Sequence, residues 1–222
     1  PIATRGRLLD IRPHEVQSVG LHDGENTLEF YKDEADWRIK DSQGLKVDAA
    51  RLNRLIINLA ALTIVEAKTS NTSLYDRLDL GTNAKKIQLN EHVLFIGKAA
   101  GGGAQRYFMR TGADQQVYVV DPMPQISWAL KDWAGLKIPN LDKSRVRNVS
   151  IRHADGSYIK IVTAAIGSNF TLADLGQNEE PVYDQVGDAL AGAFNYLTYD
   201  AIAPVSELSF EKAIQTRFET WD

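Results

Sequence analysis

Apolar and polar residues alternate along two stretches of the chain that lie about 130 residues apart, and both stretches share one layout. In each, the alternation runs up to an Asp-Gly pair, Asp23-Gly24 or Asp155-Gly156, and resumes after it. Asp-Gly between two period-2 segments is typical of a β-hairpin, because a type I′ turn requires positive φ at its central positions. A large apolar residue, Trp37 or Phe170, then stands in a further short segment. Each stretch therefore predicts two strands and a short third one.

A helix is predicted after each of these stretches. In the first, Asp48 is a suitable N-cap. Apolar residues then recur at helical spacing, namely Leu52, Leu55, Ile56, Leu59 and Leu62. In the second, Pro181 suits the first helical position and follows the acidic pair Glu179-Glu180. Its apolar stripe consists of Val182, Val186, Leu190, Ala193, Phe194 and Leu197. Both helices end in a Leu-Thr pair before a short extended segment, so the pattern predicts one ββ(β)α module used twice.

The residues between the modules predict a β-rich insert. Two short strands surround Asn90-Glu91, and a second hairpin runs from residue 106 to 120. A short helix is predicted over residues 126–136, where it would carry Trp128 and Trp133. The tail from Phe210 alternates once more and predicts one further strand.

Together these elements predict an α+β fold of two related ββ(β)α modules with a β-hairpin-rich insert between them. The first module covers residues 1–70, the insert 71–140 and the second module 141–205, while 206–222 begin a further strand unit. A strand without a partner is an unusual end for a domain. We therefore expect the native chain to continue beyond Asp222.

The composition is that of an ordinary globular protein, with 44% apolar and 24% charged residues among 222. The net charge of −4 gives no basic surface for nucleic acid or for anionic lipid. Cysteine is absent, which excludes disulfides, thiolate metal sites and cysteine nucleophiles. No apolar run approaches the ~18–20 residues that a membrane span requires.

The glycine-rich stretch from Gly97 to Gly103 is the most conspicuous motif. A phosphate-binding P-loop would need Lys and then Ser or Thr after its second glycine, at the start of a helix. Here Ala104 and a predicted strand follow instead, so we interpret the stretch as a hairpin loop.

Other catalytic and metal-binding patterns are also missing. The histidines, His14, His22, His92 and His153, lack the spacing of a zinc site. No Gly-x-Ser-x-Gly elbow is present. The sequence thus predicts no catalytic residue, no metal ligand and no cofactor.

Among the acidic and aromatic residues, only the aromatic ones remain candidates for a ligand site. The acidic clusters Asp33-Glu34-Asp36 and Glu179-Glu180 are explained by a solvated loop and a helix start. Three aromatic residues, Tyr107, Trp128 and Trp133, could line a ligand groove or could belong to the core. They are the sequence's candidates for ligand binding.

An ordered series of segments resembles the family known as domain of unknown function 4340, from about Leu9 to Asp222. The series starts at Trp37-Arg38-Ile39, before the helix that Asp48 caps. The other segments are Leu74-Tyr75-Asp76-Arg77-Leu78-Asp79-Leu80, Leu94-Phe95-Ile96-Gly97, Tyr107-Phe108-Met109-Arg110, Gln116-Val117-Tyr118-Val119-Val120-Asp121 and the second module from Val146. The chain departs from the family at Asp79, where glycine is frequent, and near Thr82 to Ala84, where a proline is expected.

The resemblance carries expectations about location and function. Members look like bacterial envelope proteins with one amino-terminal membrane helix and an extracytoplasmic repeat domain. Some are encoded beside, or fused to, auxiliary components of ABC-type transporters related to gliding-motility systems. The resemblance therefore implies a periplasmic domain whose anchor would lie before Pro1.

The family has no established catalytic residues that could be transferred to this chain. We therefore expect a non-enzymatic accessory or scaffolding domain that binds a protein partner in a membrane complex. The alternative is a small-molecule or glycan-binding domain that uses the aromatic residues, and an enzyme is a third class. A sheet edge suited to strand addition, from Ile214 to Thr220, is the expected contact with a partner.

Overall fold

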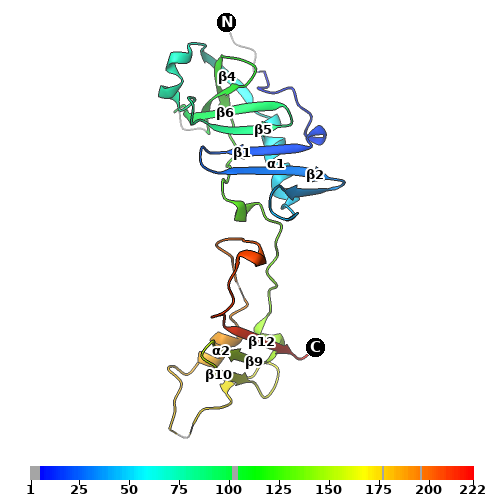
Figure 1. Ribbon diagram of the computed structural model, residues 1–222, viewed down its shortest axis with the longest axis vertical. Coiled ribbons are helices and arrows are strands. Elements are labelled where there is room, and N and C mark those ends of the chain that lie inside the picture. The colour runs from blue at the N-terminus through cyan, green and yellow to red at the C-terminus, as the bar shows by residue number, and fades with distance from the viewer. Residues whose placement is uncertain (1–5, 102–104, 177, 196) are drawn as a thin grey trace. The chain divides into compact units, whose positions relative to one another are not determined.

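The computed structural model describes residues 6–101, 105–176, 178–195 and 197–222, and it forms two compact units (Figure 1). The boundary between the units lies between Leu136 and Lys137. The expected first module and the insert thus belong to one unit, and the expected second module and the tail strand to the other. Each unit has its own sheet and its own core. The described part of the chain is of the α+β class, and strands predominate.

The first unit is built on an eight-stranded antiparallel sheet with the order β3-β2-β1-β5-β6-β7-β8-β4. Strands β1 to β3 and strands β5 to β8 pair as successive hairpins, so the predicted insert extends the sheet of the first module beyond β1, and β4 pairs with β8 at the far edge. The strands are β1 (Ser18–His22), β2 (Thr27–Asp33), β3 (Asp36–Ile39), β4 (Thr63–Thr69), β5 (Lys85–Leu89), β6 (His92–Ala99), β7 (Tyr107–Thr111) and β8 (Val117–Asp121). Single 3₁₀ turns are η1 (Pro13–Glu15), η2 (Thr72–Leu74), η3 (Asp76–Leu78) and η4 (Leu130–Asp132).

The helix α1 (Ala49–Ala60) connects the two edge strands, β3 and β4, and its apolar side packs against the sheet. The Asp48 side chain accepts a hydrogen bond from the Arg51 amide at 3.1 Å, which satisfies one free donor of the first turn. The predicted N-cap and helix are therefore confirmed. The buried face of the helix consists of Leu52, Leu55, Ile56, Leu59 and Ala60.

The second unit is a four-stranded antiparallel sheet with the order β11-β10-β9-β12. Its strands are β9 (Val146–Arg152), β10 (Tyr158–Val162), β11 (Thr171–Leu172) and β12 (Gln215–Thr220). It also contains the helix α2 (Val186–Ala191) and the 3₁₀ turns η5 (Lys143–Arg145) and η6 (Val205–Glu207). Its core is small: the buried residues are Val146, Val149, Ile151, Ile161, Phe170 and Ala191.

Both predicted Asp-Gly hairpins are present, but their turns are longer than a two-residue type I′ turn. The first pairs His22 with Thr27 and the second pairs Arg152 with Tyr158, so four or five residues form each turn. In both turns only the glycine has positive φ, +98° at Gly24 and +88° at Gly156. The aspartates instead accept hydrogen bonds from backbone amides, an arrangement that short acidic side chains favour in turns.

These turn contacts predict a loss of stability in acid. The Asn26 amide lowers the pKa of Asp23, and the Ser157 hydroxyl and amide lower the pKa of Asp155. A carboxyl group with a lowered folded-state pKa stabilises the fold above its ordinary pKa, and this contribution disappears as the pH falls through the folded-state value. In urea unfolding at pH 6, the double variant Asp23→Asn, Asp155→Asn should be slightly less stable than the parent protein. The difference should shrink at about pH 3, and an unchanged difference would contradict this assignment.

Two secondary-structure predictions were wrong. The helix expected from Pro181 spans only Val186–Ala191, because glycine within the expected span disfavours a longer helix. The helix expected over residues 126–136 is extended apart from one 3₁₀ turn. Its backbone pairs with the start of α1 instead: the Asp48 amide donates to the Trp133 carbonyl at 2.8 Å.

The tail strand also differs from the expectation, because β12 is paired. It lies antiparallel to β9, with Thr216 opposite Ile151 and Phe218 opposite Val149. Phe218 packs against the small core and makes an edge-to-face contact with Phe194 at 4.8 Å. The opposite edge of β12 has no neighbour in the sheet among the described residues. None of the helices described is long and apolar enough to cross a bilayer.

Candidate functional site

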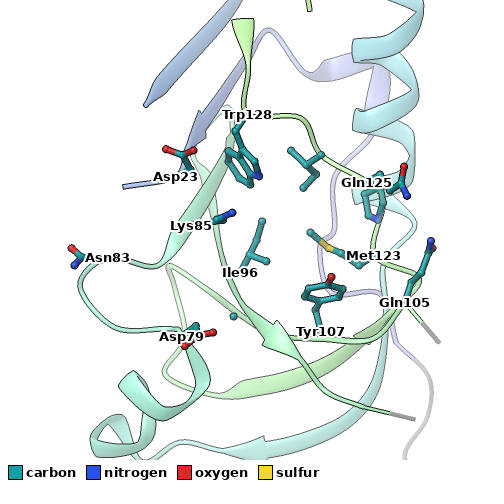
Figure 2. Close-up of a pocket in the computed structure, with 13 residues that line it drawn as sticks. Asp23, Asp79, Asn83, Lys85, Ile96, Gln105, Tyr107, Met123, Gln125 and Trp128 are labelled. Carbon is teal, nitrogen blue, oxygen red and sulfur yellow. The ribbon is translucent and has the colours of Figure 1, made fainter. Parts of the chain in front are cut away.

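A pocket of about 780 Å³ opens at one end of the large sheet in the first unit (Figure 2). Its walls come from the strands β5, β6 and β7, from the β1–β2 turn and from the segment 123–128 that follows β8. Its size lies within the ~300–1,000 Å³ typical of small-molecule sites. The lining residues include Asp23, Asp79, Asn83, Lys85, Ile96, Gln105, Tyr107, Met123, Gln125 and Trp128.

The pocket continues the apolar face of the sheet that packs against α1. Side chains two positions apart on a strand share a face, so Lys85 lies on the side of the buried Ile87, and Tyr107 on the side of the buried Met109. Lys85 is also opposite Ile96, which forms part of the pocket wall. Polar side chains thus begin where the apolar core ends, at the mouth of the pocket.

Two of the three predicted aromatic residues meet in this pocket. Tyr107 comes from the first residue of β7, and Trp128 comes from the segment after β8, and both are half-buried. The Lys85 ammonium lies 5.1 Å from the centre of the Trp128 ring, within the range of a cation–π interaction. The structure therefore assembles an aromatic site from residues that are 21 positions apart.

Trp133, the third aromatic candidate, belongs to the core. Only 1% of its surface is exposed, and its ring lies 5.5 Å from that of Phe30. The indole N–H donates to the Ser127 carbonyl at 2.9 Å, and the Arg51 guanidinium lies 5.2 Å from the ring centre. A side chain so enclosed is placed to stabilise the fold, whereas Tyr107 and Trp128 remain accessible.

Several polar side chains around the pocket make no hydrogen bond or ion pair with any residue that the structure describes. They are Asp79, Asn83, Lys85, Gln105, Tyr107 and Gln125. Asp23 differs, because its carboxylate accepts from the Asn26 amide at 2.8 Å, a contact that lowers its pKa. The pocket therefore offers both donors and acceptors to a bound molecule.

Asp79 reaches the pocket through an unusual backbone conformation. Its φ of +58° places it in the left-handed region, directly after the turn η3. Asp and Asn are among the few non-glycine residues that tolerate this region. The one sequence signal at Asp79 is its departure from the glycine that the resemblance leads us to expect at this step, whereas Asn83, Gln105 and Gln125 carried no signal.

Gly97, the first residue of the glycine-rich motif, lies inside β6 and is buried. A Cβ atom there would lie 2.2 Å from the Leu78 carbonyl oxygen, so glycine is needed for the close approach of the chain beside η3. The hairpin loop is therefore shorter than predicted and begins after Ala99. Residues 102–104 of the motif lie outside the described residues.

The histidines and acidic clusters are dispersed over the surface. His22 contacts the Thr27 hydroxyl at 3.1 Å, and Asp33 forms an ion pair with Arg38 at 2.8 Å. The Glu179 carboxylate accepts from the Gly176 amide at 3.0 Å. Within the described ranges, no three His, Cys, Asp or Glu side chains come together in a way that could hold a metal ion.

Comparison with known proteins gives one assignment. The sequence profile of a family described as Domain of unknown function (DUF4340) matches residues 37–214, which is most of the chain. The chain belongs to this family. Comparison with curated proteins and with solved structures gave no match. The match spans α1, nearly all of the pocket and most of the second unit. The description of the family names no activity.

Proposed function

We propose that this member of the DUF4340 family is a non-enzymatic accessory domain that binds a protein partner through its second unit. The supporting observation is the distribution of exposed apolar side chains. Of the fourteen large apolar residues that are exposed in the described chain, eleven lie between Lys137 and Asp222. Contiguous exposed apolar surface is a frequent mark of a protein interface, and these side chains would contribute to one.

The exposed residues are concentrated where the second unit has little regular structure. Val182 is 95% exposed, Val205 73% and Phe210 60%. These side chains lie outside α2 and the strands, and the core of the unit contains only six buried residues among those described. Covering them with a partner would remove apolar surface from water, which favours association by roughly 25 cal/mol for each Å² buried.

The open edge of β12 adds a second means of binding. Every second backbone group on this edge points away from β9, where a further strand can pair with it. Edge strands that must not pair often carry charges or proline. β12 does carry two charged residues, Arg217 and Glu219, but both lie on the polar face of the sheet, and no proline removes a backbone donor from the open edge. A partner strand is therefore not blocked by the sequence of β12.

The order of strands supports a repeat and gives the direction of such a partner strand. In the first unit β3, β2 and β1 are neighbours and α1 follows them, and in the second unit β11, β10 and β9 are neighbours and α2 follows them. The other neighbour of β1 is β5, and that of β9 is β12. We infer that each unit contains one copy of the same module. Since β6 covers β5 as an antiparallel strand, we expect a partner strand to run antiparallel to β12.

The location of the domain is proposed from the family resemblance. A periplasmic domain, tethered by an amino-terminal membrane helix and associated with an ABC-transporter-like complex, would meet its partner beside the membrane. Its second unit would then act as the docking surface, and its first unit would be free for another role.

Site-specific photo-crosslinking in the full-length protein, expressed in its native cell envelope, tests this function. A photoreactive amino acid at Phe210, Ile214 or Thr216 should yield one discrete crosslinked partner. The same group at Ile57, an exposed apolar position on α1, should not. The double variant Phe210→Asp, Ile214→Asp should reduce the co-purified partner by about tenfold, as expected for the loss of ~1.4 kcal/mol of binding free energy.

One matched control accompanies this experiment. Ile57→Asp makes the same change at an exposed apolar position of the first unit and should leave co-purification unchanged. Phe218 is not a suitable test position, because it packs against the core and its substitution would disturb the fold. Equal crosslinking from Ile57 and Phe210, or none from the second unit, would refute the proposed surface.

A further inference from the structure

The pocket of the first unit points to a binding activity that is independent of the proposed protein partner. We propose that this pocket binds a sugar residue, neutral or amino-bearing, which lies against the rings of Trp128 and Tyr107 (Figure 2). Such a site would add ligand recognition to a domain whose second unit carries the protein-binding surface.

The apolar part of the pocket suits the carbon face of a sugar ring. Ile96 and Met123 are buried and form one part of its wall, while Trp128 and Tyr107 are half-buried and accessible. Aromatic rings with one apolar and one wet side are favoured where a ligand has both kinds of surface. The ring C–H groups of a pyranose are the matching apolar surface.

The polar part of the pocket suits hydroxyl groups. Asp79 and Asn83 lie on one side in Figure 2, and Gln105 and Gln125 on the other. A carboxylate only accepts hydrogen bonds, an ammonium only donates them, and an amide does both. A sugar hydroxyl also donates and accepts, so it can pair with every one of these groups. A hydrocarbon ligand would leave them all unpaired, which costs binding free energy.

The charge of the pocket narrows the class of sugar. The pocket is lined by two carboxylates, those of Asp23 and Asp79, and by one ammonium group, that of Lys85, so the site has a net negative charge. The Asn26 amide lowers the pKa of Asp23 and so further favours its charged form. Phosphorylated and carboxylated sugars are therefore disfavoured by repulsion, while a neutral or an amino sugar is not.

Titration of the protein with four defined sugars tests the proposal. The probes are glucose, glucosamine, N-acetylglucosamine and glucose 6-phosphate, each added up to about 50 mM, well above a dissociation constant of ~1 mM. The readout is the indole N–H signal of Trp128 in ¹⁵N-correlated NMR spectra. At least one of the first three should shift this signal saturably, and glucose 6-phosphate should bind at least tenfold more weakly than the sugar that binds best.

Two variants link the binding to the pocket. Trp128→Ala removes the aromatic wall and should weaken binding at least tenfold. Because this variant lacks the indole signal, its binding is measured from the NMR shifts of backbone amides that line the pocket. Asp79→Gly removes one carboxylate while keeping a residue that adopts positive φ without cost, so the turn should be preserved. It should weaken binding about tenfold or more, as expected for the loss of one hydrogen bond to a charged group.

The control is Trp221→Ala, which removes an exposed tryptophan of the second unit and should leave sugar affinity unchanged. The proposal is overturned if none of the three sugars shifts the Trp128 signal saturably, or if glucose 6-phosphate binds best. It is also overturned if a folded Asp79→Gly protein binds with unchanged affinity. None of these outcomes bears on the partner-binding surface, which is tested at other residues and in another assay.

Discussion

Replacing Trp133 by alanine is expected to lower the free energy of unfolding of the first unit by about 3–5 kcal/mol, the range for deleting a large buried aromatic side chain. Trp133 is 1% exposed, packs against Phe30 and donates its indole hydrogen bond to the Ser127 carbonyl. Its removal would leave a cavity between the sheet and α1 and an unpaired carbonyl group. Urea unfolding, followed by circular dichroism, measures the change.

The matched control is Trp128→Ala in the same segment of chain. Trp128 is half-buried, and its indole N–H makes no hydrogen bond with the described residues, so its loss should cost clearly less than the loss of Trp133. Equal destabilisation by the two variants would mean that Trp128 is also structural. That result would weaken the distinction between a core aromatic residue and a pocket aromatic residue.

Gly97→Ala is expected to destabilise the first unit by about 3 kcal/mol, near the upper end of the range for overpacking a buried site. The added Cβ atom would lie 2.2 Å from the Leu78 carbonyl oxygen and 3.1 Å from that of Phe108. Both neighbours are backbone atoms, so relief requires β6 or the chain beside η3 to move. Thermal unfolding should show a fall in the midpoint of several degrees, at about 2–4 °C for each kcal/mol.

Gly20→Ala is the comparison for this effect. Gly20 is also a buried strand glycine, but the nearest atom to its added Cβ would be the end of the His22 side chain at 3.0 Å. Because that side chain can rotate away, the cost should be much smaller than at Gly97. A Gly97→Ala protein as stable as Gly20→Ala would show that the chain beside η3 adapts freely to β6.

These stability tests bear on both proposals. Gly97 lines the pocket, and Trp133 supports the segment from which Trp128 projects. Loss of sugar binding in these two variants would follow from a disturbed first unit. Partner capture should persist in them, because the exposed apolar residues and β12 belong to the second unit.

Short-range patterns determined much of the fold. The Asp-Gly hairpins at Gly24 and Gly156 follow from alternation that ends at a residue able to adopt positive φ. The helix α1 follows from Asp48 at its start and an apolar stripe of the correct period. The hairpins of the insert were predicted in the same way, because two adjacent antiparallel strands require only a turn and an alternation of apolar and polar residues.

Elements whose conformation depends on distant partners were predicted less well. The apolar residues within 126–136 recur at helical spacing. The backbone of this segment nevertheless pairs with residues 46–48, which lie some 85 positions away in the chain. The helix α2 is short, and Gly187 allows it to approach the Phe170 carbonyl, where a Cβ would lie 2.4 Å away. Neither of these contacts can be predicted from a short stretch of sequence.

The sequence by itself determined the order of hairpins, the first helix, the family and three aromatic candidates for a ligand site. Only the tertiary structure decided that Trp133 is core and that Trp128 and Tyr107 share a pocket. It alone showed Asp79 beside them, and β12 paired on one edge and open on the other. The physical reason is that periodicity reports which face of an element is buried, whereas a site depends on which elements meet, and that is decided by long-range pairing and packing.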